Sequence, residues 1–329
     1  MSRTSAAHTS AARTSAARTS AEIATQPAAW RRAAGAAAGF EGLPEPGERV
    51  AVTGCGTSWF MAIAYAALRE AAGLGETDAF AASEFPAGRR YDRVVAITRS
   101  GTTTEVLDLL GALRGRVPTT ALTTDPATPV MTAADAVAVL DWADEESVVQ
   151  TRFATTAFAF LRAGLGDLSG GLPGGPAGRT TGGLPGLKSV AEAAVEAELA
   201  LTEPLPEAVL GAEQWTFLGR GWTYGLALEA ALKMREAAGA WTEAYPAMEY
   251  RHGPIAVTAP GRVTWVLGPL PEGLAGEVAK AGGTLVSRPG ADPLADLVRA
   301  QRLAVTVAES RGLDPDRPRN LTRSVILSP

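Results

Sequence analysis

Three side chains that suit proton transfer lie within one short segment of this chain. Lys233 and Glu236 are three positions apart on a predicted helix, and His252 follows within residues 249–254. The only other histidine, His8, lies in a repetitive N-terminal segment. Imidazole titrates near neutral pH and a carboxylate can accept a proton, so this segment brings together an acid, a base and a cation. It predicts proton-transfer chemistry.

Structural roles could also account for these residues. A lone histidine often closes a turn before a proline, and Glu229 with Lys233 forms an i,i+4 pair typical of a solvated helix face, which Glu236 could extend. Glu249, three residues before the histidine, either orients it or completes a substrate site. The grouping of residue types favours a catalytic role for Glu236 and His252. For Lys233 it leaves both the catalytic and the structural role open.

The composition narrows the classes of function. The chain has 329 residues, of which 46% are hydrophobic, enough for two domains. A net charge of -5 supplies no basic field for nucleic acid or for an anionic membrane. One cysteine cannot form an internal disulfide, which suits a reducing cytoplasm, and one cysteine with one histidine outside the repeats makes zinc unlikely. We expect a cytoplasmic protein without metal, nucleic acid or membrane partners.

The first residues form a Thr-Ser-Ala-Ala repeat interrupted by His8 and two arginines. The repeat lacks large apolar side chains and cannot bury enough surface to fold alone. We therefore predict a disordered tail over residues 1–21.

Two passages repeat one order: a short apolar strand, a Gly-x-Gly turn, hydroxyl-bearing residues and an Ala/Leu-rich helix. They span residues 49–68 and 215–232. Other strands and helices alternate around them. These are predicted at residues 93–98, 104–113, 119–123, 136–140, 155–163, 189–201, 263–267, 284–286 and 294–311, with a mobile Gly/Pro-rich connection at 164–186. This duplication predicts an α/β fold of two related domains, residues 22–187 and 188–329, each a parallel sheet covered by helices on both faces.

Hydroxyl-bearing residues gather in three loops of the first half, at residues 56–58, 98–104 and 147–151. Ligands of parallel sheets bind beyond the carboxyl ends of the strands, where helix N-termini and hydroxyls can enclose a phosphate. One such loop would be explained by ordinary helix capping, but three at one sheet edge favour an anion pocket. A dinucleotide site is disfavoured because Gly54 and Gly56 lack a third glycine.

Taken together, the motifs resemble the SIS (sugar isomerase) family. They are GCGTS at 54–58, the Ser-Gly-Thr loop at 100–102, SVVQT at 147–151, GRG at 219–221 and the segment 231–254. The chain is most similar to the isomerase half of glutamine–fructose-6-phosphate aminotransferases (glucosamine-6-phosphate synthases), over nearly all residues beyond the tail. The resemblance implies two tandem SIS domains of three-layer, flavodoxin-like fold in a homodimer, with a phosphosugar bound in the first domain and no cofactor.

The resemblance also implies roles for individual residues. Glu236 would shuttle the proton, His252 would open the sugar ring, in some relatives across a dimer interface, and Lys233 would stabilise negative charge. Phosphate ligands would be Ser58, Thr98, Ser100, Thr103 and Thr151, with Arg99 in place of a common glutamine, and further substrate contacts would come from Thr57, Val149 and Glu249. An arginine at position 99 could add a bidentate phosphate contact or project to solvent.

Three departures from the family pattern bear on the reaction. Arg323 stands where the aminotransferases carry an imine-forming lysine, and a guanidinium is no such nucleophile, although it could hold a phosphate or polarise a hydroxyl. No glutaminase segment precedes residue 22, so we expect no ammonia source within this chain. Residues 287–294 pass quickly from strand to helix, which suggests that a strand of the second half is missing.

These observations leave three functions open. The first is an aldose–ketose isomerase that acts on a hexose or amino-sugar 6-phosphate through an enediol-type proton transfer. The second is a deaminase or deglycase for amino-sugar phosphates. The third is a non-catalytic phosphosugar sensor. The presence of both Glu236 and His252 favours catalysis.

Overall fold

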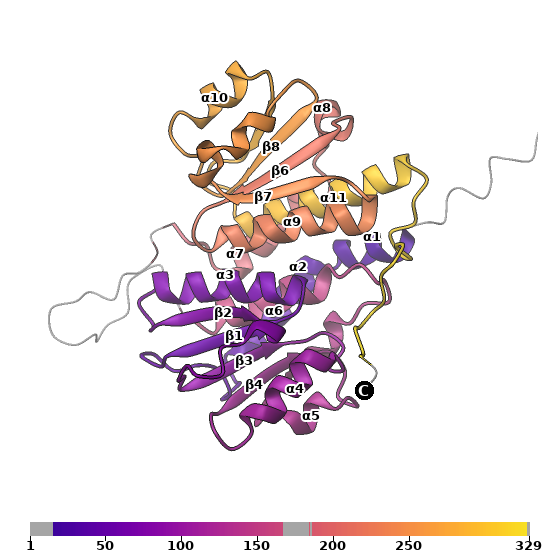
Figure 1. Ribbon diagram of the computed structural model, residues 1–329. Helices are drawn as coiled ribbons and strands as arrows, with labels where there is room; N and C mark the ends of the chain where they lie inside the picture. The colour runs from indigo at the N-terminus through magenta and orange to yellow at the C-terminus, as the bar shows by residue number, and fades with distance from the viewer. Residues whose placement is uncertain (1–15, 167–183, 185, 328–329) are drawn as a thin grey trace, which may run out of the picture.

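Two parallel sheets with flanking helices make up the protein (Figure 1). The computed structural model describes residues 16–166, 184 and 186–327. The first sheet has the order β2-β1-β3-β4-β5 and the second the order β7-β6-β8-β9, with parallel neighbours throughout. The strands are β1 (Val50–Gly54), β2 (Thr77–Ala81), β3 (Arg93–Ile97), β4 (Thr119–Thr123), β5 (Ala136–Val139), β6 (Gln214–Gly219), β7 (Thr242–Pro246), β8 (Arg262–Leu267) and β9 (Thr284–Ser287).

Helices cover both faces of each sheet. The helices are α1 (Ala17–Ala24), α2 (Gln26–Ala37), α3 (Thr57–Ala71), α4 (Thr104–Leu113), α5 (Val130–Ala133), α6 (Arg152–Ala163), α7 (Val190–Ala200), α8 (Glu207–Leu210), α9 (Thr223–Ala238), α10 (Leu274–Lys280) and α11 (Pro293–Ser310). In the first half α2, α3 and α6 lie on one face and α4 and α5 on the other; in the second half α7, α9 and α11 lie on one face and α10 on the other. Every residue of β1 and of β4 is buried, as expected of central strands in a sheet covered on both sides.

The shared order of the two passages is confirmed by the strand order and by the two glycine turns, whereas two tandem domains remain a prediction. Both sheets place their second strand beside the first and continue with the third and fourth. Gly56 and Gly221 have positive φ angles of 54° and 57°. A Cβ on Gly54 or Gly219 would lie 2.7 or 2.3 Å from the helix that follows, so both turns need two glycines. The shortened second half is also confirmed, because its described residues form no counterpart of β5.

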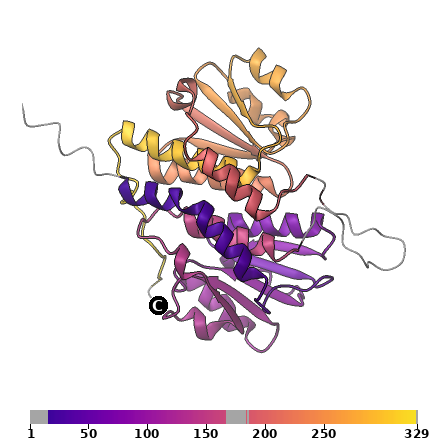
Figure 2. The same ribbon diagram turned by 180° about the vertical axis from the view of Figure 1, so that it is seen from behind.

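The two halves share one apolar core. Helix α3 packs against α9, and a Cβ on Gly225 would lie only 2.4 Å from the carbonyl oxygen of Phe60. Helices α1 and α2 cross the back of the molecule, where α2 contacts both α6 and α7 and α1 contacts α11 (Figure 2). The largest buried cluster contains side chains from both sheets. The halves therefore pack as one body, and their division into domains at residues 187 and 188 remains a prediction.

The predicted disordered tail over residues 1–21 is wrong from residue 16 onward. Helix α1 begins at Ala17, and Ala16 and Thr19 are buried. Alanine favours helix, and Asp316 caps the helix by accepting hydrogen bonds from the amides of Arg18 and Thr19 at 3.1 and 2.8 Å. Residues 1–15 and most of the connection predicted at 164–186 lie outside the described residues.

Across the residues that the structure describes, no helix is long and apolar enough to cross a membrane.

Candidate functional site

A cavity of about 210 Å³ lies at the carboxyl ends of β1 and β3. Its walls come from the three predicted hydroxyl loops, from α9 and from the C-terminal segment, residues 321–325. The predicted site residues that line it are Thr57, Ser58, Thr98, Arg99, Ser100, Thr103, Glu236 and Arg323. Eight of the predicted residues, drawn from four separate parts of the sequence, are thus brought to one cavity.

The hydroxyl groups of this cavity are not consumed by helix capping. Helix α3 begins at Thr57 and α4 follows Thr103, and neither helix has a side-chain cap at its N-terminus. The hydroxyl oxygen of Thr98 is buried and has no hydrogen-bond partner among the described residues. Ser100 donates to Ser324 at 3.1 Å. The hydroxyls of Thr98, Ser58 and Thr103 and the start of α3 therefore remain available to an anion, whereas the first amide of α4, that of Thr104, already donates to the carbonyl oxygen of Val325 at 3.3 Å.

Lys233 lies beneath Glu236 in a buried charge cluster. Its ammonium contacts Glu236, donates to Thr57 at 3.0 Å and lies 3.4 Å from Glu229. The side chains of Glu229 and Lys233 are 0% and 1% exposed, so the solvated helix face is wrong for this pair. The side chain of Glu236 keeps 19% exposure and lines the cavity.

Burial shapes the protonation of this cluster. It raises the pKa of Glu229 to about 7, and Lys233 opposes that rise only in part. Burial alone would lower the pKa of Lys233, but Glu229 and Glu236 together raise it above its ordinary value. The cluster therefore holds a firmly charged ammonium next to a carboxyl that titrates near neutrality.

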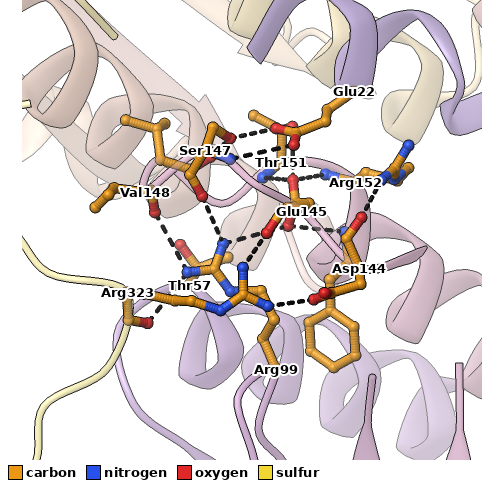
Figure 3. Close-up of polar contacts among 12 residues, drawn as sticks. Glu22, Thr57, Arg99, Asp144, Glu145, Ser147, Val148, Thr151, Arg152 and Arg323 are labelled. Atoms are coloured by element: carbon orange, nitrogen blue, oxygen red, sulfur yellow. Dashed lines mark hydrogen bonds and ion pairs between the residues drawn. The ribbon is translucent and has the colours of Figure 1, made fainter. Parts of the chain in front are cut away.

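Arg99 lines the cavity, but its guanidinium turns to the loop behind it. It lies 3.6 Å from the carboxylate of Glu145 and donates to the carbonyl oxygens of Ser147 and Val148 at 3.3 and 3.4 Å (Figure 3). Only 5% of the Arg99 side chain is exposed, so projection to solvent is wrong. Glu145 compensates the charge of Arg99, and both terminal guanidinium nitrogens donate to the loop. Among the described residues only Nε has no partner, so the predicted bidentate phosphate contact has no free pair of donors.

The structure does not bring Thr151 or Val149 into the cavity. Thr151 donates from its amide and hydroxyl to Glu145 at 2.6 and 2.9 Å. Val149 is buried in the apolar core. From the same loop, Val148 and Gln150 line the cavity instead. The SVVQT segment thus borders the cavity, but through Val148 and Gln150 and not through the predicted Val149 and Thr151.

His252 and Glu249 also lie away from the cavity. Both belong to the turn η3 (Glu249–His252) beside the second sheet, and both are exposed. Neither lines the cavity of its own chain. A ring-opening role for His252 would therefore need a second copy of the chain.

Arg323 fixes the C-terminal segment to the first half. Its guanidinium donates to the Asp144 carboxylate and to the carbonyl oxygen of Glu145, and its own carbonyl accepts from Arg99 at 3.1 Å (Figure 3). The next residue, Ser324, accepts from Thr102 at 3.0 Å. Arg323 is thus at the cavity wall, but its charge is used to hold the segment in place.

Two buried carboxylates were missed by the sequence reasoning. Glu145 accepts from the first amides of α6, those of Arg152 and Phe153, and so caps that helix from outside. Glu22 accepts from the Ser147 amide at 3.2 Å and from its hydroxyl, and burial raises the pKa of Glu22. Both residues position the loop that walls the cavity. Only the resemblance, which begins at Glu22, gave any signal for either.

Comparisons with known proteins agree with this architecture. No protein-family model matches the chain. It is 29% identical over 315 residues to the glutamine–fructose-6-phosphate aminotransferase [isomerizing] of Gloeobacter violaceus, covering 84% of this chain and 52% of that protein. It is 30% identical over 315 residues to the enzyme of the same name from Symbiobacterium thermophilum, covering 84% and 51%. The chain spans about half the length of the curated relatives it matches.

Solved structures match over almost the whole fold. Glucosamine-6-phosphate deaminase from Thermotoga maritima superposes with a TM-score of 0.72 at 23% identity, covering 94% of this chain and all of that one. Tagatose-6-phosphate ketose/aldose isomerase from Escherichia coli gives 0.69 at 19% identity, covering 96% and 99%. These likenesses show the fold. The resemblance inferred from the motifs is thus supported by relatives named as isomerizing aminotransferases and by the two-sheet α/β architecture shared with these solved structures.

Proposed function

We propose that this chain is a phosphosugar aldose–ketose isomerase that acts on a hexose or amino-sugar 6-phosphate, built from two tandem SIS domains. One observation carries the proposal: the Glu236 carboxylate lines the same cavity as the hydroxyls of Ser58, Ser100 and Thr103. An anion site and a candidate general base within one small cavity are what an enediol mechanism needs. The names of the relatives support the same class of substrate.

The phosphate would be held by neutral groups. Ser58, Ser100 and Thr103 line the cavity, and so does the first turn of α3 at Thr57 and Ser58. Helix N-termini favour anions through their unpaired amides and their dipoles. The open sugar would then extend toward Glu236.

Glu236 would move the proton between carbons 1 and 2. The substrate carbonyl acidifies the neighbouring C–H bond, so a carboxylate suffices as base. Lys233 contacts Glu236 from below, and this ammonium would add positive charge near the developing oxyanion. Glu229, buried on the other side of Lys233, keeps that ammonium charged.

His252 would be supplied by a second copy of the chain. It is exposed and lies outside the cavity of its own chain, so a homodimer is part of the proposal. Mixing inactive Glu236→Gln and His252→Ala chains tests this, because a mixed dimer would contain one intact site. Recovery of activity on mixing is expected; no recovery in mixtures shown to exchange subunits would remove His252 from the mechanism.

Amino-sugar deamination or deglycation is the alternative within the same chemistry. Arg323 is bound to Asp144 and to the backbone of Glu145, and a protonated guanidinium forms no imine. Covalent capture of the sugar, as a lysine there would permit, is thus disfavoured. Ammonia release from glucosamine 6-phosphate, compared with isomerisation of fructose 6-phosphate, separates the two reactions.

The decisive experiment follows hydrogen exchange at the sugar. Purified protein is incubated with fructose 6-phosphate in D₂O, and deuterium at carbons 1 and 2 of the recovered sugars is measured. Glu236→Gln should abolish exchange while the sugar still raises the melting temperature, and the exposed control Glu272→Gln should exchange like wild type. Exchange at the wild-type rate in Glu236→Gln would refute the assignment, and no exchange by wild type would refute the isomerase.

A further inference from the structure

A second cavity lies on the other side of Glu236. It measures about 620 Å³ and is formed by the C-terminal end of α9, the end of α11 and residues 311–320. Glu236 lines both cavities, and the consecutive residues Asn320 and Leu321 line one cavity each. The two spaces therefore meet at Glu236 and the C-terminal segment.

Arginines dominate the charge of this second cavity. Arg235, Arg311, Arg317 and Arg319 line it against two carboxylates, Glu236 and Asp314. Glu236 is already paired with Lys233, and a carboxylate oxygen of Asp314 accepts a backbone amide at 3.0 Å. Within the described ranges, none of the four arginines makes an ion pair with a carboxylate. The lining of the cavity thus carries more positive than negative charge, four guanidinium groups against two carboxylates.

The four guanidinium groups divide into a fixed pair and a free pair. Arg235 donates to the carbonyl oxygen of Thr242 at 3.2 Å, and Arg311 donates to that of Ala238 at 3.0 Å. These contacts use only part of each five-donor fork. Arg317 and Arg319 are exposed and flank Pro318, whose ring restricts the backbone between them. Planar guanidinium forks suit carboxylates and phosphates.

We infer that this cavity is an anion subsite for a carboxylate or phosphate borne on the amine substituent of the sugar substrate. The inference rests on the proposed function, because that function places the sugar phosphate at the hydroxyl loops and carbons 1 and 2 at Glu236. A substituent on the amine then extends past Glu236 toward the arginines. The preferred substrates are sugar 6-phosphates with an anionic group at both ends.

Matched ligands test the subsite directly. The probes are fructose 6-phosphate and two of its 1-amino derivatives, one with glycine and one with ethanolamine on the amine. The glycine derivative carries a carboxylate where the ethanolamine derivative carries a neutral hydroxymethyl group. Calorimetry on wild-type protein should show the glycine derivative binding about tenfold tighter than the ethanolamine derivative, the size expected of two partly exposed ion pairs. A third derivative, with phosphoethanolamine, asks whether phosphate or carboxylate is the better occupant.

Variants locate the effect. The double variant Arg317→Ala/Arg319→Ala should reduce the advantage of the glycine derivative to less than about twofold, and Arg90→Ala, an exposed arginine far from the cavity, should retain it. Melting temperatures check that all variants are folded. A gain for either anionic derivative that the double variant removes supports the subsite. Equal binding of all three derivatives to wild type, or a gain that survives the double variant, overturns it.

Fructose 6-phosphate itself distinguishes failure of the subsite from failure of the proposed function. If it binds and Ser100→Ala weakens it, but the anionic derivatives gain nothing, only the subsite is overturned. If neither fructose 6-phosphate nor any derivative binds, the proposed function and the subsite both fall.

Discussion

Replacement of Lys233 by methionine tests the buried charge cluster that supports Glu236. Lys233 is 1% exposed and is the only cation that the described structure places within 4 Å of Glu229 and Glu236. Methionine has a similar length and no charge. The substitution would leave Glu229, which is fully buried, without a counter-ion. A buried carboxylate without a partner avoids the cost of its charge by taking up a proton.

The size of the loss follows from the pKa of Glu229. One pKa unit corresponds to about 1.4 kcal/mol. Because the wild-type pKa of Glu229 is about 7, protonating this carboxyl at pH 8 costs about that amount. At pH 6 it is already protonated and this cost vanishes. Loss of the ammonium contacts to Glu236 and Thr57 adds about 1.5 kcal/mol at either pH. We expect Lys233→Met to lower the free energy of unfolding by about 3 kcal/mol at pH 8 and about 1.5 kcal/mol at pH 6.

Urea denaturation at the two pH values measures this difference. The control Lys188→Met removes a partly exposed ion pair with Glu196 and should cost less than about 1 kcal/mol at both. The folded wild type binds the Glu229 proton more tightly than the unfolded chain, whose carboxyl titrates near 4.5, so this group lowers stability as pH rises from about 4.5 to about 7. Glu229→Gln should remove that decline. An equal loss for Lys233→Met at pH 6 and pH 8, or a larger one at pH 6, would refute the reasoning.

Three further substitutions test the frame and the anion pocket. Gly225→Val should lower the free energy of unfolding by about 1–3 kcal/mol in urea denaturation, because its Cβ would lie 2.4 Å from a backbone oxygen of α3. The control Gly276→Ala, at an open position of α10, should leave the free energy of unfolding unchanged. Asp316→Ala should destabilise α1 by about 1 kcal/mol and speed hydrogen exchange at its first amides; unchanged exchange would contradict the capping role. Ser100→Ala should weaken fructose 6-phosphate binding about fivefold in calorimetry, with Ser83→Ala as the unaffected control; equal affinities would remove the hydroxyl from the site.

Features that depend on near neighbours in sequence were predictable. Seven of the nine described strands, the two Gly-x-Gly turns and the hydroxyl loops each have a local cause: an apolar run, a turn that excludes a Cβ, or a helix start. Parallel topology then carries those local features to one sheet edge, which is why Ser58 and Ser100 could be placed together. Glu236 lies on α9 of the second half and was assigned to the same site only by the resemblance. The edge strands β2 and β7 were missed, since their half-buried residues give no continuous apolar run.

Features that depend on distant partners were not predictable. Helix α1 requires Asp316, almost 300 positions away, and the loop at 145–151 requires Glu22. The orientation of Arg99 follows from Glu145, a residue that no local pattern distinguishes. In each case a buried carboxylate meets its donors only after folding. Burial strengthens such a contact, and a sequence pattern does not show which residues will be buried.

The arginine at position 323 changes what the C-terminal segment can do. Its charge is used by Asp144 and Glu145, and its backbone carbonyl is held by Arg99, so the segment is tied to the cavity wall by contacts from both sides. A lysine there would have one ammonium and could not donate to both acceptors in the same plane as a guanidinium does. With arginine at this position the segment is held beside Ser324 by hydrogen bonds, and the protonated guanidinium cannot form an imine. This favours a substrate held by its anionic groups over one captured through its carbonyl.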